Sequence, residues 1–409
     1  MSLFRGAVIL KYLPFATHFE RRMEIFVEWC RRDRAAHADP NEFGYITSGL
    51  SARIRRGHIF EDGYMRLNVP SRDSSILKRR IVIEFIDQFG LEEAGIDAGG
   101  VFKEFLTSLV AEAFQPNAGL FKATADQLLY PNPGAYAQDE THLGYMTFLG
   151  KMVGKALYEQ LLIDIEFTTF FLAKWLGRRS YLDDLPSLDP TLYKGLLYLK
   201  SAPDAAELEL TFSIDEDEFG VSKTFDLIPN GRTIAVTNAN RLRYIYLVAD
   251  YRLNREIEAQ CRAFFSGLSA LLRPEWLRIF NTRELQIMLS GAPGVPIDVE
   301  DLRQNTLYTG VYDQDHPTIR LFWAWFANQT DDIRRQFTRF ATSCSRPPLL
   351  GFKDLVPLFC IRDAGTDLQR LPTASTCVNL LKLPQYTTYE QLAAQMEKAV
   401  TSNAGFDLS

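Results

Sequence analysis

The chain has 409 residues, of which 46% are hydrophobic and 12% aromatic, and its formal net charge is −6 with an isoelectric point near 5.6. This length exceeds one compact core, so we expect two or three folding units, and the apolar content excludes an intrinsically disordered chain. The acidic balance excludes nucleic-acid binding as the main role, because that role needs a basic surface.

The cysteines occur singly, without CxxC pairs and without the Cys/His spacing of zinc sites; they are Cys30, Cys261, Cys344, Cys360 and Cys377. In a chain of this size the pattern is typical of a reducing compartment, and it predicts neither a disulfide framework nor a bound metal. The N-terminus has no clean signal-peptide pattern, and no apolar stretch reaches the length of a membrane span. We therefore expect a soluble protein of the cytoplasm, and also of the nucleus, with no cofactor and no membrane partner.

Residues 1–60 are expected to form an N-terminal helical extension, in which apolar residues from Met23 to Cys30 recur at helical spacing. Residues 80–86 (RIVIEFI) predict a strand, and a glycine-rich turn at 95–100 then leads into a helix with an apolar face. The turn fits neither GxGxxG nor the P-loop pattern, so it predicts no phosphate site.

Residues 142–176 contain two further helical patterns, and Pro186 and Pro190 then indicate the start of a smaller unit over about 186–255. In this unit we expect a helix through residues 192–199 and a strand over 208–214. An acidic turn (DEDEFG) and a hairpin partner over 223–227 should follow. A long helix is predicted to begin near Asn238 or Asn240, since asparagine favours helix N-caps.

The most linker-like segment is SGAPGVP at 290–296, with two glycines and two prolines, and it predicts a hinge over 291–296. Beyond it, helices are expected after His316-Pro317 and after Thr330-Asp331-Asp332. Strands are expected over 355–361 and 378–383, and a last helix should open with the capping-box pattern Thr387-x-x-Glu390. We therefore expect residues 297–409 to form a compact α/β unit.

Cys377 lies in a polar, proline-containing loop that enters the predicted strand. A thiol is the strongest nucleophile available near neutral pH, and a loop on a rigid scaffold can present it to a partner. A single cysteine at the start of a strand is, however, more often a small core residue. Local chemistry alone leaves both interpretations open.

The segment around this cysteine, followed at the chain end by Gly405-Phe406, resembles the active-site and tail motifs of HECT-type ubiquitin ligases; it reads RLPTASTCVNLLKLPQY over 370–386. Further motifs of that family have similar segments in the same order here: GLEEAGIDAGGVFKEF, FLGKMVGKALYEQLLIDIEF, LVADYRLN and TSCSRPPLLGF. The resemblance extends from about residue 20 to the end. Some of these segments are most similar to proteasome-associated members of the family, which adds the proteasome to the expected partners.

The resemblance implies a bilobal α+β fold: a mainly helical N-lobe over 61–290 with a small partner-binding subdomain at about 186–255, the hinge, and a C-lobe over 297–409. It also implies a ubiquitin transferase. Cys377 would accept ubiquitin as a thioester from a charged conjugating enzyme and pass it to lysines of a protein substrate or of ubiquitin itself. The family uses no cofactor for this reaction.

Six residues match the family's groove for the conjugating enzyme: Leu192, Leu196, Leu199, Leu210, Tyr244 and Val248. The alternative is that they form the core of the small subdomain.

Near the nucleophile, Thr376 can hydrogen-bond a developing oxyanion. Phe406 matches a tail aromatic that positions the C-lobe, although it could equally pack the last helix. Ser375 stands where many members have histidine, so no adjacent imidazole is expected. The carboxylate that assists the acceptor lysine stays open among Glu93, Asp97, Glu104, Asp407 and the terminus at Ser409.

Two other functions compete with this one. A cysteine protease would need Cys377 beside an imidazole, but no recognisable protease motif surrounds the histidines, which are His18, His37, His58, His142 and His316. An inactive ligase-like scaffold would bind a conjugating enzyme or ubiquitin without forming an adduct.

Overall fold

The computed structural model describes residues 8–38, 50–87, 89–92, 100–134, 138–218, 221–292, 294–342 and 344–401. The chain forms two compact units. The first unit comprises Met1–Ala113, Lys155–Ile165 and Gln286–Ser409, and the second comprises Phe114–Gly154 and Glu166–Leu285. Helices with several small sheets make up both units, which confirms the predicted α+β class.

In the first unit, the 3-10 turn η1 (Pro14–Ala16) precedes the helix α2 (Phe19–His37), which confirms the helix predicted from Met23 to Cys30. Met23, Phe26 and Cys30 are buried on one face of α2. The strands β1 (Leu50–Arg55) and β2 (Ile81–Ile86) pair in parallel, with α3 (Ile59–Leu67) and η2 (Ser71–Lys78) between them in the chain. The helix α4 (Gly100–Ala113) packs on β2 and α3.

The second unit starts with η3 (Pro116–Ala118) and the short antiparallel pair β3 (Phe121–Ala123) and β4 (Leu129–Pro131). The two helices predicted over 142–176 are confirmed as α5 (Glu140–Glu159) and α6 (Thr169–Trp175). After the small subdomain come α9 (Glu258–Ser269), α10 (Pro274–Leu277) and α11 (Thr282–Ser290), whose residues from Gln286 onward belong to the first unit. Aromatic rings fill the centre of this unit, where Trp175 stacks on Phe264 with ring centroids 5.5 Å apart.

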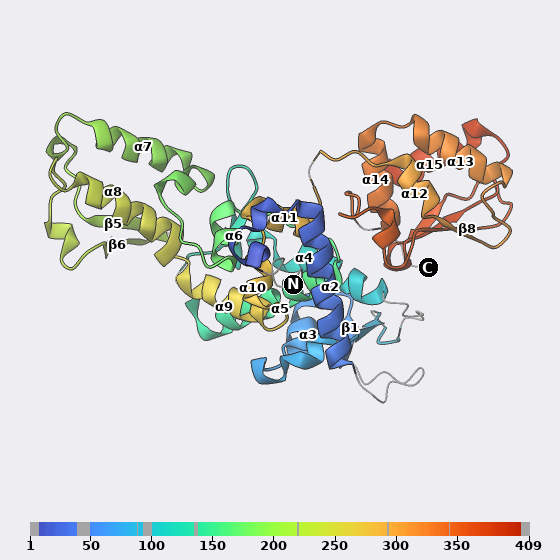
Figure 1. The fold of residues 1–409 in the computed structure, drawn as a ribbon, viewed down its shortest axis with the longest axis horizontal. Helices are drawn as coiled ribbons and strands as arrows, with labels where there is room; N and C mark the ends of the chain where they lie inside the picture. Colours follow the sequence, from blue (N-terminus) through green and yellow to red (C-terminus); the bar gives the residue numbers. More distant parts are fainter. Residues whose placement is uncertain are drawn as a thin grey trace. The chain divides into compact units, whose positions relative to one another are not determined.

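The small subdomain comprises η5 (Leu182–Ser187), α7 (Pro190–Ser201), η6 (Ala206–Leu208), the hairpin β5 (Ser213–Glu218) and β6 (Val221–Asp226), η7 (Gly231–Thr233), α8 (Arg241–Asp250) and the π-helical turn η8 (Tyr251–Arg255). Figure 1 shows α7, α8 and this hairpin together. The helix beginning after Asn240 is confirmed.

The strand predicted over 208–214 is wrong for most of its length, because Glu209 adopts a left-handed conformation with φ of 51° and interrupts the extended chain. β5 instead runs through the acidic residues that were predicted as a turn. It does so because β6 offers complementary partners across the hairpin: Lys223 lies opposite Glu216, and the Thr224 hydroxyl donates to the Asp215 carboxylate at 2.6 Å.

The C-terminal part of the first unit comprises α12 (Val299–Gln304), β7 (Leu307–Thr309), α13 (Pro317–Asn328), α14 (Asp331–Thr342), η9 (Phe352–Asp354), β8 (Cys360–Asp363), β9 (Thr373–Ser375), η10 (Thr376–Val378), β10 (Leu380–Leu383) and α15 (Tyr389–Thr401). The strand order is β7-β8-β10-β9, with β9 antiparallel to β10 and the other pairs parallel. One hydrophobic core runs from Ile297 to Val400 and includes Phe322, Phe326 and Phe337. This confirms the α/β character predicted for 297–409.

Two strands and one cap of this region differ from the predictions. The strand expected over 355–361 is confined to Cys360–Asp363, since Pro357 has no N–H to donate to a sheet. The strand expected from Val378 begins at Leu380, because Asn379 is left-handed. The cap of α15 is Thr388 rather than Thr387, because the Thr388 hydroxyl accepts from the Gln391 amide at 3.3 Å. The Gln391 side chain accepts from the Thr387 hydroxyl at 3.3 Å.

Two glycines allow α5 and α9 to approach each other closely. A Cβ added at Gly150 would overlap the Phe264 carbonyl, and one added at Gly267 would overlap the Thr147 carbonyl. Both obstacles are backbone atoms, which cannot rotate away as a side chain can. The helix pair therefore depends on the absence of side chains at these two positions.

We predict that Gly150→Ala lowers the melting temperature and the free energy of unfolding, by about 1–3 kcal/mol, because the helices must separate. Gly195→Ala in α7 is the control: nothing lies within 4 Å of its added Cβ, so the better helix propensity should stabilise it by about 0.5–1 kcal/mol. Denaturant unfolding followed by circular dichroism measures both changes. Equal stability of the two variants would contradict the close-packing argument.

Candidate active site

Cys377 lies in the turn that joins two antiparallel strands of the C-terminal sheet. Ser375 of β9 pairs with Leu380 of β10, and the residues between them form the 3-10 turn η10 and its end at Asn379. Four-residue hairpin loops are commonly built around such a turn. The cysteine backbone therefore lies in a short loop beyond an edge strand, where the sheet fixes the loop at both ends.

Asn379 closes this turn and is fully buried. Its φ and ψ of 50° and 44° are left-handed, a conformation that asparagine tolerates better than most residues. Its backbone N–H donates to the Thr376 carbonyl at 3.3 Å, and its own carbonyl accepts from the Cys360 amide at 2.9 Å. The backbone of this one residue thus links the cysteine turn to strand β8.

The side chain of Asn379 is bound at both ends. Its Nδ2 donates to the Pro357 carbonyl at 2.7 Å, and its Oδ1 accepts from Nζ of Lys103 in α4 at 2.9 Å. Lys103 is only 7% exposed. A buried amide group that loses one partner costs about 1–3 kcal/mol, so these bonds resist a change of the turn.

Three of the other cysteines are poor nucleophiles because of burial. Burial raises the pKa of Cys30 and of Cys261 to about 12 and also raises the pKa of Cys344. The attacking species is the thiolate, which these thiols do not form near neutral pH. Cys360 is half-buried in β8, with its sulfur 3.6 Å from the Thr309 hydroxyl.

The other residues predicted near the nucleophile divide into three groups. Ser375 ends β9 and Thr376 begins the turn, so both are sequence neighbours of Cys377 on the same hairpin. Glu104 of α4 forms an ion pair with Arg56. The remaining predicted residues lie outside the described part of the chain: Phe406, Asp407, Ser409, Glu93 and Asp97.

The described histidines have hydrogen-bond or capping roles within their own segments, away from Cys377 in the sequence. His37 bonds to the Asp33 carbonyl, His58 to the Glu61 carboxylate and His142 to the Asp139 carboxylate, each within its own segment. His316 caps α13 by accepting from the Thr318 amide, and His18 precedes α2. These roles give no support to a Cys–His protease pair.

Comparison with known proteins identifies the family. The model of the HECT-domain (ubiquitin-transferase) family matches residues 107–409, which is more than half of the chain. This chain belongs to the HECT family. The prediction from the ordered motifs is therefore confirmed.

Several curated relatives of this HECT chain are ubiquitin ligases by name. A probable E3 ubiquitin protein ligase of Schizosaccharomyces pombe is 47% identical over 97% of this chain and 38% of its own length. The E3 ubiquitin-protein ligase UPL6 of Arabidopsis thaliana is 43% identical over 99% of this chain and 39% of its own length. The human ubiquitin-protein ligase E3B is 39% identical over 99% of this chain and 40% of its own length. The chain thus spans about two fifths of these relatives.

The six residues predicted for the conjugating-enzyme groove lie on α7, before β5 and on α8. Leu196, Leu199, Tyr244 and Val248 are buried, while Leu192 and Leu210 are half-buried. The exposed apolar side chains of the same elements are their neighbours: Leu197 and Tyr198 on α7, Phe225 on β6, and Leu242 and Tyr246 on α8. Tyr244 and Val248, which were chosen by their position in the family motifs, lie on the buried face of α8.

The predicted hinge of this HECT chain is tied at both ends. Arg346, in the segment after α14, donates to the carbonyls of Ser290 and Gly291 at 3.1 and 3.2 Å. Arg335 donates to the Val295 carbonyl at 2.7 Å. Gly291 and Gly294 both have positive φ, a conformation that glycine adopts without strain. Sequence reasoning missed the two arginines because their distance along the chain gives no signal.

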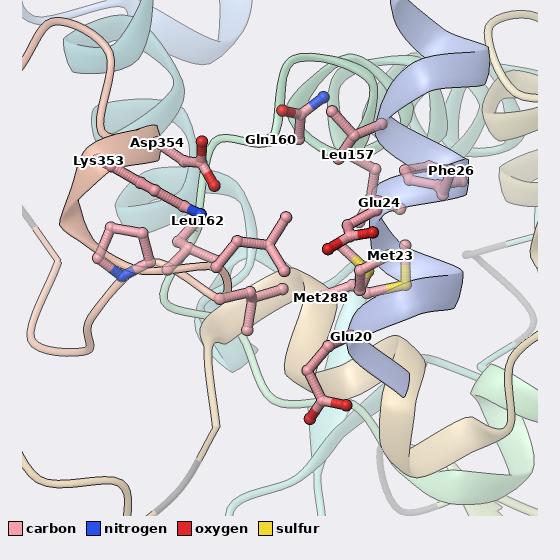
Figure 2. A pocket seen from close by; sticks show the side chains of 14 residues that line it. Glu20, Met23, Glu24, Phe26, Leu157, Gln160, Leu162, Met288, Lys353 and Asp354 are labelled. Atoms are coloured by element: carbon pink, nitrogen blue, oxygen red, sulfur yellow. The ribbon is translucent and has the colours of Figure 1, made fainter. Parts of the chain in front are cut away.

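A separate cavity of about 560 Å³ lies between α2 and the segment around η9 (Figure 2). Its walls are mainly apolar and include Met23, Leu162 and Met288. Figure 2 shows Glu24 on α2 and Lys353 on the opposite side of the opening. No residue of the Cys377 turn lines this cavity, so it is distinct from the candidate active site.

Two general findings concern membranes and metals. Within the described ranges, no helix combines the length and the apolar composition needed to cross a bilayer. Among the same residues, no group of three or more His, Cys, Asp or Glu side chains is placed to hold a metal ion.

A buried carboxylate lies where the hairpin meets the π-helical turn of the second unit. Burial raises the pKa of Glu256 to about 7; Arg252 opposes this shift, whereas the Glu216 carboxylate adds to it. Arg252 donates to both carboxylates, at 2.9 Å to Glu256 and 3.1 Å to Glu216. The native state therefore binds a proton at Glu256 at a pH where the unfolded chain has released it.

We predict that Glu256→Gln becomes increasingly stable relative to wild type as pH rises from about 4.5 to above 7. The raised pKa of Glu256 stabilises the wild-type fold at low pH, and this contribution is lost as pH rises through the folded-state value of about 7. Glutamine cannot ionise and keeps the neutral form. Unfolding by urea at pH 5, 6, 7 and 8 measures the difference, with exposed Glu258→Gln as control. A difference that does not change with pH would contradict the burial argument.

Proposed function

We propose that this chain is the catalytic part of a ubiquitin ligase that carries ubiquitin as a thioester on Cys377 before passing it to a lysine. The observation that carries this proposal is the position of Cys377 in a short turn held by buried hydrogen bonds, within a HECT family match. The high pKa values of the buried thiols support it further, because they leave few alternative nucleophiles. Ligase names among the relatives agree with it.

The first step exchanges one thioester for another. The Cys377 thiolate attacks the carbonyl carbon of the thioester that links ubiquitin to a conjugating enzyme, and a new carbon–sulfur bond forms. The bond to the conjugating enzyme's sulfur breaks, and that thiolate leaves with the electron pair. The step is nearly isoenergetic, so its rate depends mainly on proximity and orientation. Thr376 is our candidate donor to the oxyanion that develops on the carbonyl oxygen.

The second step makes an amide bond. A neutral lysine amine of a substrate, or of another ubiquitin, attacks the thioester carbon, and the Cys377 thiolate leaves. The lysine must first lose a proton, which a nearby carboxylate can accept or orient. Since Glu104 is already paired with Arg56, our candidates narrow to Glu93, Asp97, Asp407 and the terminal carboxylate at Ser409. Phe406 of that tail is our candidate for holding the loaded C-lobe.

The lobe arrangement is part of this proposal. We infer an N-terminal extension over 1–60, an N-lobe over 61–290, a hinge over 291–296 and a C-lobe over 297–409. Movement about the hinge would have to break the hydrogen bonds that Arg346 makes with Ser290 and Gly291 and the bond between Lys103 and Asn379. The proposed partners are a charged conjugating enzyme, ubiquitin, protein substrates and the proteasome, and the proposed location is the cytoplasm and nucleus.

The conjugating enzyme is proposed to dock on the small subdomain at 186–255. Half-buried Leu192 and Leu210 and the exposed side chains of α7 and α8 supply the apolar contact that such interfaces need. Buried Leu196, Leu199, Tyr244 and Val248 would hold this surface in place from within.

The decisive experiment uses activating enzyme, a conjugating enzyme and ubiquitin. We predict that the wild-type chain forms a ubiquitin adduct that thiol reductants release, and that Cys377→Ala forms none, since no carbon–sulfur bond can form without the thiol. Non-reducing gel electrophoresis measures the adduct. Cys360→Ala is the matched control and should form the adduct as wild type does.

Two results would contradict this function. An adduct that survives in Cys377→Ala would place the thioester elsewhere. A wild-type chain that binds the charged conjugating enzyme but never forms an adduct would instead support the inactive scaffold.

The docking surface has its own prediction. Tyr246 on α8 is 48% exposed, whereas Tyr244 is 8% exposed and packs edge-on against Phe212 with ring centroids 5.5 Å apart. Tyr246→Ala should therefore slow adduct formation at low concentrations of the conjugating enzyme and leave the melting temperature unchanged. Tyr244→Ala should lower stability by about 3 kcal/mol through the cavity it creates. Unchanged transfer in Tyr246→Ala would exclude this face of α8 from the interface.

A further inference from the structure

We propose that Asn379 is a positioning residue for Cys377, and that Lys103 of α4 holds the Asn379 side chain in place. This inference rests on the proposed function, because a positioning residue needs a nucleophile to position. The two residues come from different motifs: Lys103 belongs to GLEEAGIDAGGVFKEF and Asn379 to the active-site segment, far along the chain. Their 2.9 Å hydrogen bond joins the two motifs directly.

Asn379 makes one hydrogen bond with each of four polar groups around the turn. The backbone bonds close the turn at the Thr376 carbonyl and tie it to the Cys360 amide of β8. The side-chain bonds tie it to the Pro357 carbonyl and to Lys103. The turn that carries Cys377 is therefore fixed to the sheet, to the segment before β8 and to α4 through a single residue.

The left-handed backbone alone does not explain why asparagine, rather than glycine, occupies position 379. Glycine adopts φ of 50° without strain and would close the same turn. Asparagine adds a carboxamide whose oxygen and nitrogen are both bound, in a residue with no exposed surface. The side chain therefore supplies a constraint beyond the conformation of the turn.

Lys103 adds a second argument. Lys103 is 7% exposed as a whole residue, so its ammonium group loses much of its hydration, and an apolar side chain would fill the same space without this cost. Its Nζ is directed to the carboxamide oxygen of Asn379, and α4 packs against η10. A buried cation at this place restricts the carboxamide to one orientation, because only its oxygen can accept.

The consequence for the reaction is geometric. Thioester exchange between two proteins needs the sulfur and the carbonyl carbon in a near-attack arrangement, and a displacement of about 1 Å can cost on the order of a hundredfold in rate. Alkylation by a small reagent has no such requirement, since the reagent approaches from any open direction. Loss of positioning should therefore slow ubiquitin transfer much more than alkylation.

The test compares Asn379→Gly, Lys103→Met and wild type in the full chain. Asn379→Gly keeps the left-handed backbone and removes both side-chain bonds; Lys103→Met removes the donor that α4 supplies to the Asn379 carboxamide. We expect the maximal rate of adduct formation at saturating charged conjugating enzyme to fall about tenfold to a hundredfold in Asn379→Gly, and by a smaller factor in Lys103→Met. The concentration for half-maximal rate should change less than twofold, and so should the iodoacetamide alkylation rate of Cys377.

Gln127→Gly provides the matched control, because exposed Gln127 is also left-handed, with φ of 62°, in the turn between β3 and β4. It should form the adduct at the wild-type rate. Wild-type transfer by Asn379→Gly would overturn the positioning role, and wild-type transfer by Lys103→Met would overturn the part assigned to Lys103. A parallel loss of transfer, alkylation and melting temperature would reduce Asn379 to a stability residue. A wild-type chain without adduct would instead overturn the proposed function itself.

Discussion

The buried carboxamide of Asn379 accepts from Lys103 and donates to Pro357, and the arrangement around Cys377 depends on both bonds. A buried amide cannot exchange a lost partner for water, so each bond resists displacement of the turn. The left-handed backbone of the same residue ends η10 and lets β10 begin at Leu380. Asn379 therefore connects the turn η10, the four-stranded sheet and the helix α4.

The C-terminal core of this HECT chain supports the turn that carries Cys377. The C-terminal core from Ile297 to Val400 is apolar and aromatic, and it supplies the rigid support on which a short loop can carry a reactive group. Polar groups also connect segments near this core to the preceding helices, with Arg346 bonded to Ser290 and Lys103 bonded to Asn379.

The small subdomain shows the same division between support and contact. Leu196, Leu199, Tyr244 and Val248 are buried, while Tyr198, Leu242 and Tyr246 remain exposed on the same helices. Apolar surface on both faces of α8 is more than a core needs, and it fits a helix that packs inward and binds outward. Glu256, Glu216 and Arg252 lie where the β5–β6 hairpin meets the π-helical turn η8, so the stability of this part depends on pH.

The sequence by itself determined the α+β class, the family and most helices, because periodic apolar residues and long ordered motifs are local signals. It also placed Cys377 in a loop before a strand, although Pro357 and left-handed Asn379 shortened the strands predicted on either side of β9. The acidic strand β5 was missed, since its support comes from Lys223 and Thr224 across the hairpin. Only the tertiary structure decided which apolar residues of α8 are exposed and which cation reaches Asn379. Both depend on residues that are distant in the chain and meet through packing, so no pattern of neighbouring letters contains them.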